Sequence, residues 1–142
     1  MTTEQRHDVL RQLQASGLRG RGGGWFPVFR KWSAVLAEDG APFVVANGGE
    51  GEPGSIKDRC VLRTRPSDVV EGLRLAVGAL GAERGIVYLK GSFREEEKRL
   101  RATIEARGLS ELLSVHRGED TYVGGEETAL LEAIEGRRAW PR

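Results

Sequence analysis

The chain has 142 residues, enough for one domain with its own hydrophobic core. Its 22 basic and 21 acidic residues nearly cancel, and a net charge of +1 gives no global field to attract nucleic acid or an anionic membrane. No apolar run approaches the roughly 20 residues of a spanning helix, and the first residues show no signal-peptide pattern, so we expect a cytoplasmic protein without membrane insertion. Cys60 is the single cysteine, which excludes an internal disulfide and an all-cysteine iron–sulfur cluster within this chain.

Helical and extended patterns alternate along the first half of the chain. Residues 3–16 predict an amphipathic helix with its apolar residues on one face. A glycine-rich segment follows, and then a short helix is expected after Pro27. The apolar, β-branched run at 42–47 is typical of a buried strand, and it leads into a second glycine-rich loop.

The second half continues the alternation. Pro66 opens a predicted helix that runs to about Leu80 and stops at Gly81. The remaining expected elements are a strand at 85–90, a charged helix at 93–107, a strand at 112–118 and a helix from about 125 to 135. This order predicts an α/β fold, a Rossmann-like three-layer sandwich with a short, mainly parallel sheet covered on both sides. In such sheets ligands bind at the carboxyl ends of the strands.

The first loop, "GLRGRGGGWFPVFRKW", spans Gly17 to Trp32. Glycine lets backbone N–H groups point at an anion and lets a flat ligand approach closely. Arginines and a lysine add positive charge, which would suit a phosphate or a flat anionic ring. The segment is neither a Walker loop nor a dinucleotide fingerprint, because no Gly-Lys-Ser/Thr follows and Trp25 stands where the third glycine belongs. The pattern alone supports anion binding and an ordinary turn equally well.

The second loop, "NGGEGEPGSIKDR", contains G-x-G-x-x-G at Gly49, Gly51 and Gly54, directly after a predicted strand. Glu50 and Glu52 lie inside the motif and would repel a pyrophosphate. Carboxylates at the end of a strand fit ribose hydroxyls or ring N–H groups better. On the pattern alone, a solvated acidic turn is the slightly better interpretation.

The third constellation is "YVGGEETALLEAIEG", in which Glu126 and Glu127 stand at a predicted helix start. The helix dipole favours carboxylates there, so simple capping accounts for them in isolation. His7 and His116 have no partners at metal-ligand spacing, and we expect no metal site. The segment "RGRGGG" also looks like an RNA-binding arginine–glycine box, but a single copy in a neutral, folded chain makes RNA binding a poor interpretation.

Taken in order and spacing, the three segments resemble the flavin-binding, NADH-oxidising subunit of respiratory complex I and the related diaphorase subunits of NAD-linked hydrogenases and formate dehydrogenases. The family pattern reads approximately GLRGRGGAGFPTGLKW, then N-A-D-E-G-E-P-G-x-x-K-D-R after a strand, then Y-x-C-G-E-E-T-A-L. The similarity covers nearly the whole chain, from about residue 10 to Arg142. It implies that residues 1–142 form a single, truncated FMN/NADH-binding-type domain, with residues 1–16 as an N-terminal helix.

The resemblance also implies which residues contact the ligands. By position, those that would contact FMN are Gly20, Arg21, Gly22, Gly23, Lys31, Asn47, Glu50, Tyr122, Gly125, Glu126 and Glu127. Those that would lie near NADH are Phe26, Glu52, Glu126 and Glu127. No catalytic acid or base is implied, because the flavin supplies the chemistry and the protein holds two rings in contact.

Four substitutions and the length depart from the family pattern, and the first is Gly24 in place of an alanine. Trp25 replaces a glycine, and an indole there would occupy the slot kept open for nicotinamide. Gly49 replaces an acidic residue and Gly124 a cysteine. Family members continue past the position of Arg142 into a further strand, an FMN-phosphate loop, a ubiquitin-like domain and a cluster domain. We therefore expect a second chain or a homodimer to complete the site, and a redox partner subunit to accept the electrons.

Two functions follow as hypotheses. The first is a flavin-dependent electron-transfer module in which hydride passes from NADH to FMN, an NADH dehydrogenase if it is active. The alternative is a non-catalytic relative that serves as an assembly, accessory or nucleotide-binding subunit. Intact Glu52 and Lys57 favour the first, whereas Trp25 and Gly49 favour the second.

Overall fold

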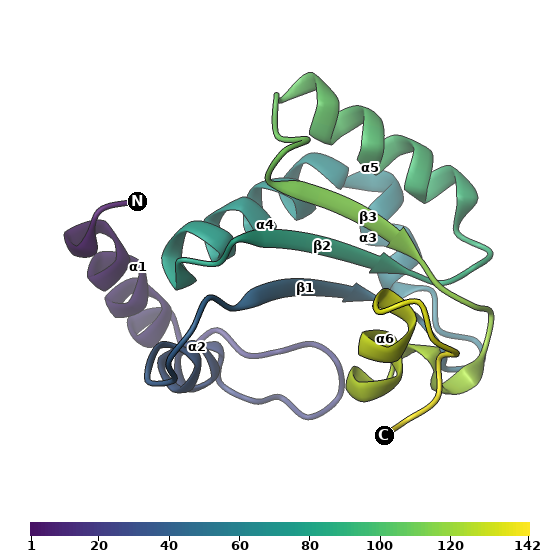
Figure 1. The fold of residues 1–142 in the computed structure, drawn as a ribbon, viewed down its shortest axis with the longest axis horizontal. Helices are drawn as coiled ribbons and strands as arrows, with labels where there is room; N and C mark the ends of the chain where they lie inside the picture. The colour runs from purple at the N-terminus through teal and green to yellow at the C-terminus, as the bar shows by residue number, and fades with distance from the viewer.

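The computed structural model describes all residues, 1–142, and shows a three-stranded parallel sheet with helices packed around it (Figure 1). The strands are β1 (Phe43–Gly48), β2 (Arg84–Leu89) and β3 (Leu113–Arg117), in the order β1-β2-β3. The register pairs Val45 with Ile86 and Val87 with Val115. The α/β class and the parallel sheet predicted from the sequence are confirmed. All three strands point the same way, so their carboxyl ends share one edge.

The helices begin and end close to where local signals place them. They are α1 (Thr3–Ser16), α2 (Val28–Leu36), α3 (Lys57–Thr64), α4 (Pro66–Leu80), α5 (Arg94–Ala106) and α6 (Glu127–Ile134), with a 3₁₀ turn over Tyr122–Gly125. Thr2 and Gln5 form a capping box at the start of α1, and Gly81 ends α4 in the left-handed conformation at φ 65°.

The main core lies on one face of the sheet, against α3, α4 and α5. Its fully buried members are Leu62, Val70, Leu73, Val77, Val87, Leu89, Phe93, Leu100, Ile104, Leu113 and Val115. A smaller cluster on the opposite face joins Tyr88 to residues of α6 and the C-terminal segment, Leu130, Ala133 and Ala139. Helices therefore lie on both faces, as the sandwich requires.

Three sequence predictions about elements are corrected. The second face is covered only near α6, since Ser114 on it is exposed and Ile86 is half-buried, so the sheet is not fully covered on both sides. The strand at 42–47 is only partly buried: Phe43 and Asn47 are exposed, whereas the apolar residues between them are half-buried against the two clusters. Helix α3 was not predicted, and its first turn lies in the segment expected to be loop. Its N-terminus is capped by the side chain of Glu50, which lies in the loop before the helix.

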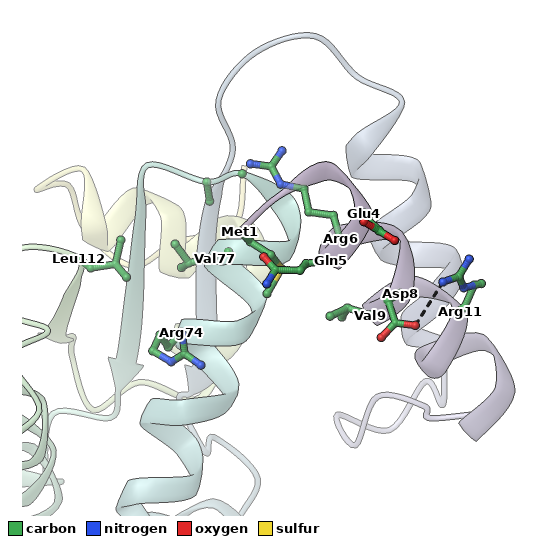
Figure 2. A pocket seen from close by; sticks show the side chains of 13 residues that line it. Met1, Glu4, Gln5, Arg6, Asp8, Val9, Arg11, Arg74, Val77 and Leu112 are labelled. Carbon is green, nitrogen blue, oxygen red and sulfur yellow. Dashed lines mark hydrogen bonds and ion pairs between the residues drawn. The ribbon is translucent and has the colours of Figure 1, made fainter.

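The N-terminal helix stands apart from the sheet and packs on α2 and α4. A groove of about 990 Å³ opens between α1 and α4 (Figure 2). Arg6 reaches from α1 over Gly81, so closely that a Cβ at that glycine would lie 2.9 Å from Nη1. None of the sequence-predicted site residues lines this groove. No helix of the structure combines the length and the apolar character needed to cross a bilayer.

Candidate functional site

A second cleft, of about 620 Å³, opens at the carboxyl edge of the sheet, where the three glycine-bearing segments meet. That volume lies within the roughly 300–1,000 Å³ typical of small-molecule sites. The segment after β1 and the 3₁₀ turn before α6 contribute most of the wall, and the first loop, the end of β1, α2, the first turn of α3 and the N-cap of α6 contribute the rest. In Figure 1 the first loop runs below β1 towards α6, which brings segments distant in sequence to one place.

Most of the sequence-predicted site residues line this cleft. Nine of its 15 lining residues were predicted: Arg21, Gly22, Lys31, Asn47, Glu50, Glu52, Tyr122, Gly125 and Glu126. Four predicted residues do not line it: Gly20, Gly23, Phe26 and Glu127. Sequence reasoning did not select six that do: Gly49, Gly51, Ser55, Lys57, Asp58 and Val123. All six stand inside the second and third quoted segments, so the continuity of those segments was the signal that could have found them.

Asn47, the penultimate residue of β1, ties two walls of the cleft together. Its side-chain Nδ2 donates to the carbonyl oxygen of Gly125 at 2.7 Å. Its Oδ1 accepts from the N–H of Gly49 at 3.0 Å. Both ends of the amide are thus engaged by the protein, and the side chain sets the distance between the second loop and the 3₁₀ turn.

Glycines allow these walls to come into backbone contact. A Cβ built on Gly125 would lie 2.0 Å from the carbonyl oxygen of Gly49, and one built on Gly51 would lie 2.2 Å from that of Tyr122. Real Cβ atoms cannot occupy such positions, so the glycines are required by packing between the two segments. Gly49 itself has no room for a side chain, since its Cβ would lie 2.9 Å from the Cα of Gly125. In this chain, position 49 therefore has room for glycine only.

Glu50 is buried and caps α3. Its Oε1 accepts from the hydroxyl of Ser55 at 2.7 Å and from the N–H of Asp58 at 3.0 Å, and its Oε2 accepts from the N–H of Arg59 at 3.3 Å. Burial raises the pKa of Glu50, but these hydrogen bonds and the charge of Lys57 outweigh it, so the pKa lies below its usual value. The carboxylate therefore stays charged and holds the beginning of α3 at the cleft.

Glu126 plays the same part at α6. Its Oε2 accepts from the Thr128 hydroxyl at 2.6 Å and from the N–H groups of Ala129 at 2.9 Å and Thr128 at 3.0 Å. These hydrogen bonds, that of the Thr128 hydroxyl first, lower the pKa of Glu126. The capping interpretation that the sequence allowed for this residue is confirmed, and Glu126 is also one of the residues that line the cleft.

Glu52 and Tyr122 form a pair across the mouth of the cleft. The Tyr122 hydroxyl donates to Oε1 of Glu52 at 2.8 Å, and both side chains are exposed. That hydrogen bond and the charge of the carboxylate raise the pKa of Tyr122. The phenol therefore stays protonated at neutral pH and acts as a donor.

Three cations line the cleft, and they differ in their partners. Lys57 is 2.7 Å from the carboxylate of Asp58. Arg21 and Lys31 make no ion pair. The positive charge available to an anionic ligand therefore comes from the first loop and α2, whereas the second loop supplies carboxylates.

Trp25 lies at the rim and does not fill the cleft. Its side chain is 55% exposed, and the indole is not part of the lining, so this structure does not show the blocked slot that the sequence suggested. It is the one non-glycine residue with positive φ, at 49°. That conformation costs roughly 1–2 kcal/mol for a residue with a Cβ. The guanidinium of Arg21 lies 4.7 Å from the indole centroid, a contact worth about 0.5–1 kcal/mol when exposed, which does not offset the cost by itself.

The sequence profile of the Nuo51 FMN-binding domain matches residues 13–142, most of the chain. The chain belongs to this family. Within it, an NADH-quinone oxidoreductase subunit of Rhizobium meliloti (strain 1021) is 38% identical over 149 residues, covering 95% of this chain and 35% of the relative. The mitochondrial NADH dehydrogenase [ubiquinone] flavoprotein 1 of Dictyostelium discoideum is 39% identical, covering 94% and 31%.

A solved structure has the same fold as this Nuo51-type chain. The crystal structure of NAD⁺-reducing [NiFe]-hydrogenase in the air-oxidized state superposes with a TM-score of 0.90 at 37% identity, covering 96% of this chain and 25% of that one. The resemblance drawn from the three segments is thus confirmed at the level of family and fold. The chain spans about a third of the length of the curated relatives it matches.

The cleft of this Nuo51-type domain fits a flavin nucleotide in its chemistry. Gly22 has open space where a Cβ would be, which leaves bare backbone for a flat ring. Arg21 and Lys31 are cations without carboxylate partners, which suits a phosphate or an electron-rich ring. Glu52 retains a free oxygen beside its bond to Tyr122, which suits a hydroxyl or an N–H donor.

Proposed function

We propose that the 620 Å³ cleft binds FMN and that the chain is the NADH-oxidising flavin module of an electron-transfer assembly. The observation that supports this most strongly is convergence: three segments that match the family lie far apart in the sequence and line one cleft. In this proposal residues 1–142 act as a single FMN/NADH-binding-type domain.

The proposal gives each wall a task. Arg21, Gly22 and Lys31 bring bare backbone and positive charge to FMN from one wall, and Gly20 and Gly23 support that wall from the first loop. Asn47, Glu50, Tyr122, Gly125 and Glu126 shape the opposite wall. Glu52 and Glu126 are offered to NADH from inside the cleft, and Phe26 and Glu127 from outside its lining. Bound FMN would accept a hydride, so the protein has only to hold the two rings together and keep competing reactions out.

The test is a titration of the purified chain with FMN, followed by flavin fluorescence and absorbance. Lys31→Ala removes a cation that lines the cleft, whereas Arg30→Ala removes its neighbour on α2, which does not. We expect saturable FMN binding that Lys31→Ala weakens by about tenfold, because a hydrogen bond to a charged group contributes about 1.5–3 kcal/mol. Arg30→Ala should leave the affinity unchanged.

Reduction is tested on the FMN-loaded chain under anaerobic conditions. Adding NADH should bleach the flavin absorbance in proportion to the NADH added. A chain that binds neither FMN nor NADH would contradict the proposal.

The second candidate function is an accessory subunit without redox activity. One observation favours it: the side chains of Asn47, Glu50 and Glu126 already have hydrogen-bond partners inside the protein. In that case the three side chains hold the fold of the cleft and contribute nothing to ligand affinity. Saturable binding of NADH without any binding of FMN would be its signature.

The proposal also includes a partner and a location. The Rhizobium meliloti relative is by its name a subunit of an NADH-quinone oxidoreductase, and we infer a partner subunit that takes electrons from this chain. Cys60 is the single cysteine of residues 1–142, so we place the next acceptor cluster outside these residues. A second copy or a second chain would complete the site, and the assembly would work in the cytoplasm. Light scattering of the FMN-loaded chain, alone and with a candidate partner, tests this.

A further inference from the structure

We propose that Trp25 is a positioning residue for Arg21, and that the pair makes the cleft select a phosphorylated flavin over an uncharged one. The inference rests on the proposed function, because it assumes that a flavin enters the cleft. The family pattern has glycine at position 25, so the contact between Trp25 and Arg21 is a feature that the family pattern lacks.

Arg21 lies between the cleft and the Trp25 indole and contacts both. Its side chain lines the cleft and at the same time lies on the indole of Trp25, with the guanidinium carbon 4.7 Å from the ring centroid. It makes no ion pair with a carboxylate, so the indole is the group that orients it. A side chain of this length would otherwise sample many rotamers in solvent, because Gly22, Gly23 and Gly24 beside it have open space around them.

The backbone that carries the indole is held in place by contacts within the loop. The guanidinium of Arg19 donates to the carbonyl oxygen of Trp25 at 3.2 Å, and the N–H of Gly20 donates to that of Phe26 at 2.9 Å. An isolated bridge between Arg19 and Pro27 closes the base of the loop. These contacts fix the backbone of Trp25 with φ at 49°, in the left-handed region that favours glycine. A bulky residue kept in that region points to a function for its side chain.

The orientation of Arg21 gives a physical reason for selecting FMN over riboflavin. A guanidinium already oriented at the rim loses less conformational entropy when it binds an anion than a freely rotating one does. Its planar donors match the oxygens of a phosphate group, which FMN has and riboflavin lacks. The oriented Arg21 therefore favours FMN and contributes little to riboflavin, whose ring and ribityl chain are uncharged.

The test uses three replacements at one position. Trp25→Phe keeps an aromatic face, Trp25→Leu keeps a side chain at positive φ without an aromatic face, and Trp25→Gly removes the side chain altogether. We expect the FMN dissociation constant to rise about two- to fivefold in the Leu and Gly variants and much less in Phe. Riboflavin affinity should be the same in all four proteins.

Thermal unfolding of the same proteins distinguishes positioning from stability. Trp25→Gly should unfold at a higher temperature than Trp25→Leu, because glycine removes the cost of positive φ, while the two share the same loss of FMN affinity. In an Arg21→Ala background, Trp25→Leu should have no further effect on FMN affinity.

Three outcomes would overturn the inference. The first is FMN affinity that follows the unfolding temperature, and the second is equal loss of FMN and riboflavin affinity. The third is tighter FMN binding in the Leu or Gly variant, which would mean that the indole obstructs the cleft. If wild-type protein binds FMN and any of these is seen, the proposed function stands and the role of Trp25 is wrong. If wild-type protein binds no FMN, both are wrong.

Discussion

The side-chain amide of Asn47 donates to the carbonyl oxygen of Gly125 at 2.7 Å, across 78 positions of sequence. The same amide accepts from the N–H of Gly49. A single side chain thus joins the end of β1 to the turn that precedes α6, and these two segments form most of the cleft wall. These two hydrogen bonds hold the two walls of the cleft against each other.

Replacing Asn47 by aspartate should loosen the cleft. The variant keeps Oδ1 but loses the Nδ2 donor, and it places a carboxylate oxygen against the Gly125 carbonyl oxygen. We expect the free energy of unfolding to fall by about 1 kcal/mol, together with weaker FMN binding. Chemical denaturation and FMN titration check both. Gln14→Glu is the matched control, because it makes the same change of charge on an exposed amide of α1 that has no side-chain hydrogen bond. Equal loss of stability in the two variants would contradict the cross-link.

Glu50→Gln should make the protein less stable at neutral pH and less sensitive to acid. Because the pKa of Glu50 in the folded protein lies below its usual value of about 4.5, its charged form stabilises the fold above pH 4.5. This contribution is lost as the pH falls through the lowered pKa. We expect a deficit of about 1–2 kcal/mol at pH 7, because hydrogen bonds to a charged group are replaced, and a shrinking deficit below pH 4.5.

Urea denaturation of wild type and Glu50→Gln between pH 7 and pH 3 measures that difference. Glu38→Gln is the control, since Glu38 is exposed and its side chain makes no hydrogen bond. A deficit that stays constant over the whole range would show that the charge of Glu50 does not stabilise α3.

Gly22→Ala should weaken FMN binding without affecting folding. Neither Gly22 nor Gly24 has an atom within 4 Å of a Cβ built on it, and neither has positive φ, so alanine fits the protein at both positions. Gly22 lines the cleft and Gly24 does not. A methyl group against a closely packed ring costs about 1–3 kcal/mol, so we expect about a tenfold loss of FMN affinity in Gly22→Ala and none in Gly24→Ala. Equal affinities in both variants would place the flavin elsewhere.

Glu96→Ala should be the most destabilising of these substitutions. Its carboxylate is completely buried and accepts from the guanidinium groups of Arg59, at 3.0 Å, and Arg63, which join α5 to α3. Removing one member of a buried ion pair costs about 3–5 kcal/mol, and half-exposed arginines place this case near the lower end. Glu95→Ala, an exposed neighbour without an ion pair, should change the unfolding temperature little. Similar unfolding temperatures for the two variants would contradict the role of Glu96.

Much of the fold could be predicted because its signals are local. Periodicity placed α1, α4 and α5, and the glycines at positions 17 and 81 stop their helices with φ near 60°. Helix α3 was missed because its N-terminus is capped from Glu50, a residue in the preceding loop. The partial exposure of β1 was missed because the residues of a strand do not show how much of each of its faces the helices cover.

The sequence by itself determined the family, the parallel α/β fold and the three segments that form the cleft, because each of these depends on residue types within short stretches of chain. The tertiary structure alone decided what the polar side chains of those segments do. In the folded chain the side chains of Asn47, Glu50 and Glu126 form hydrogen bonds with backbone groups, and the Trp25 indole lies beneath the guanidinium of Arg21. Hydrogen bonds and ring contacts depend on distances in space, and residues up to 78 positions apart acquire those distances only when the chain has folded.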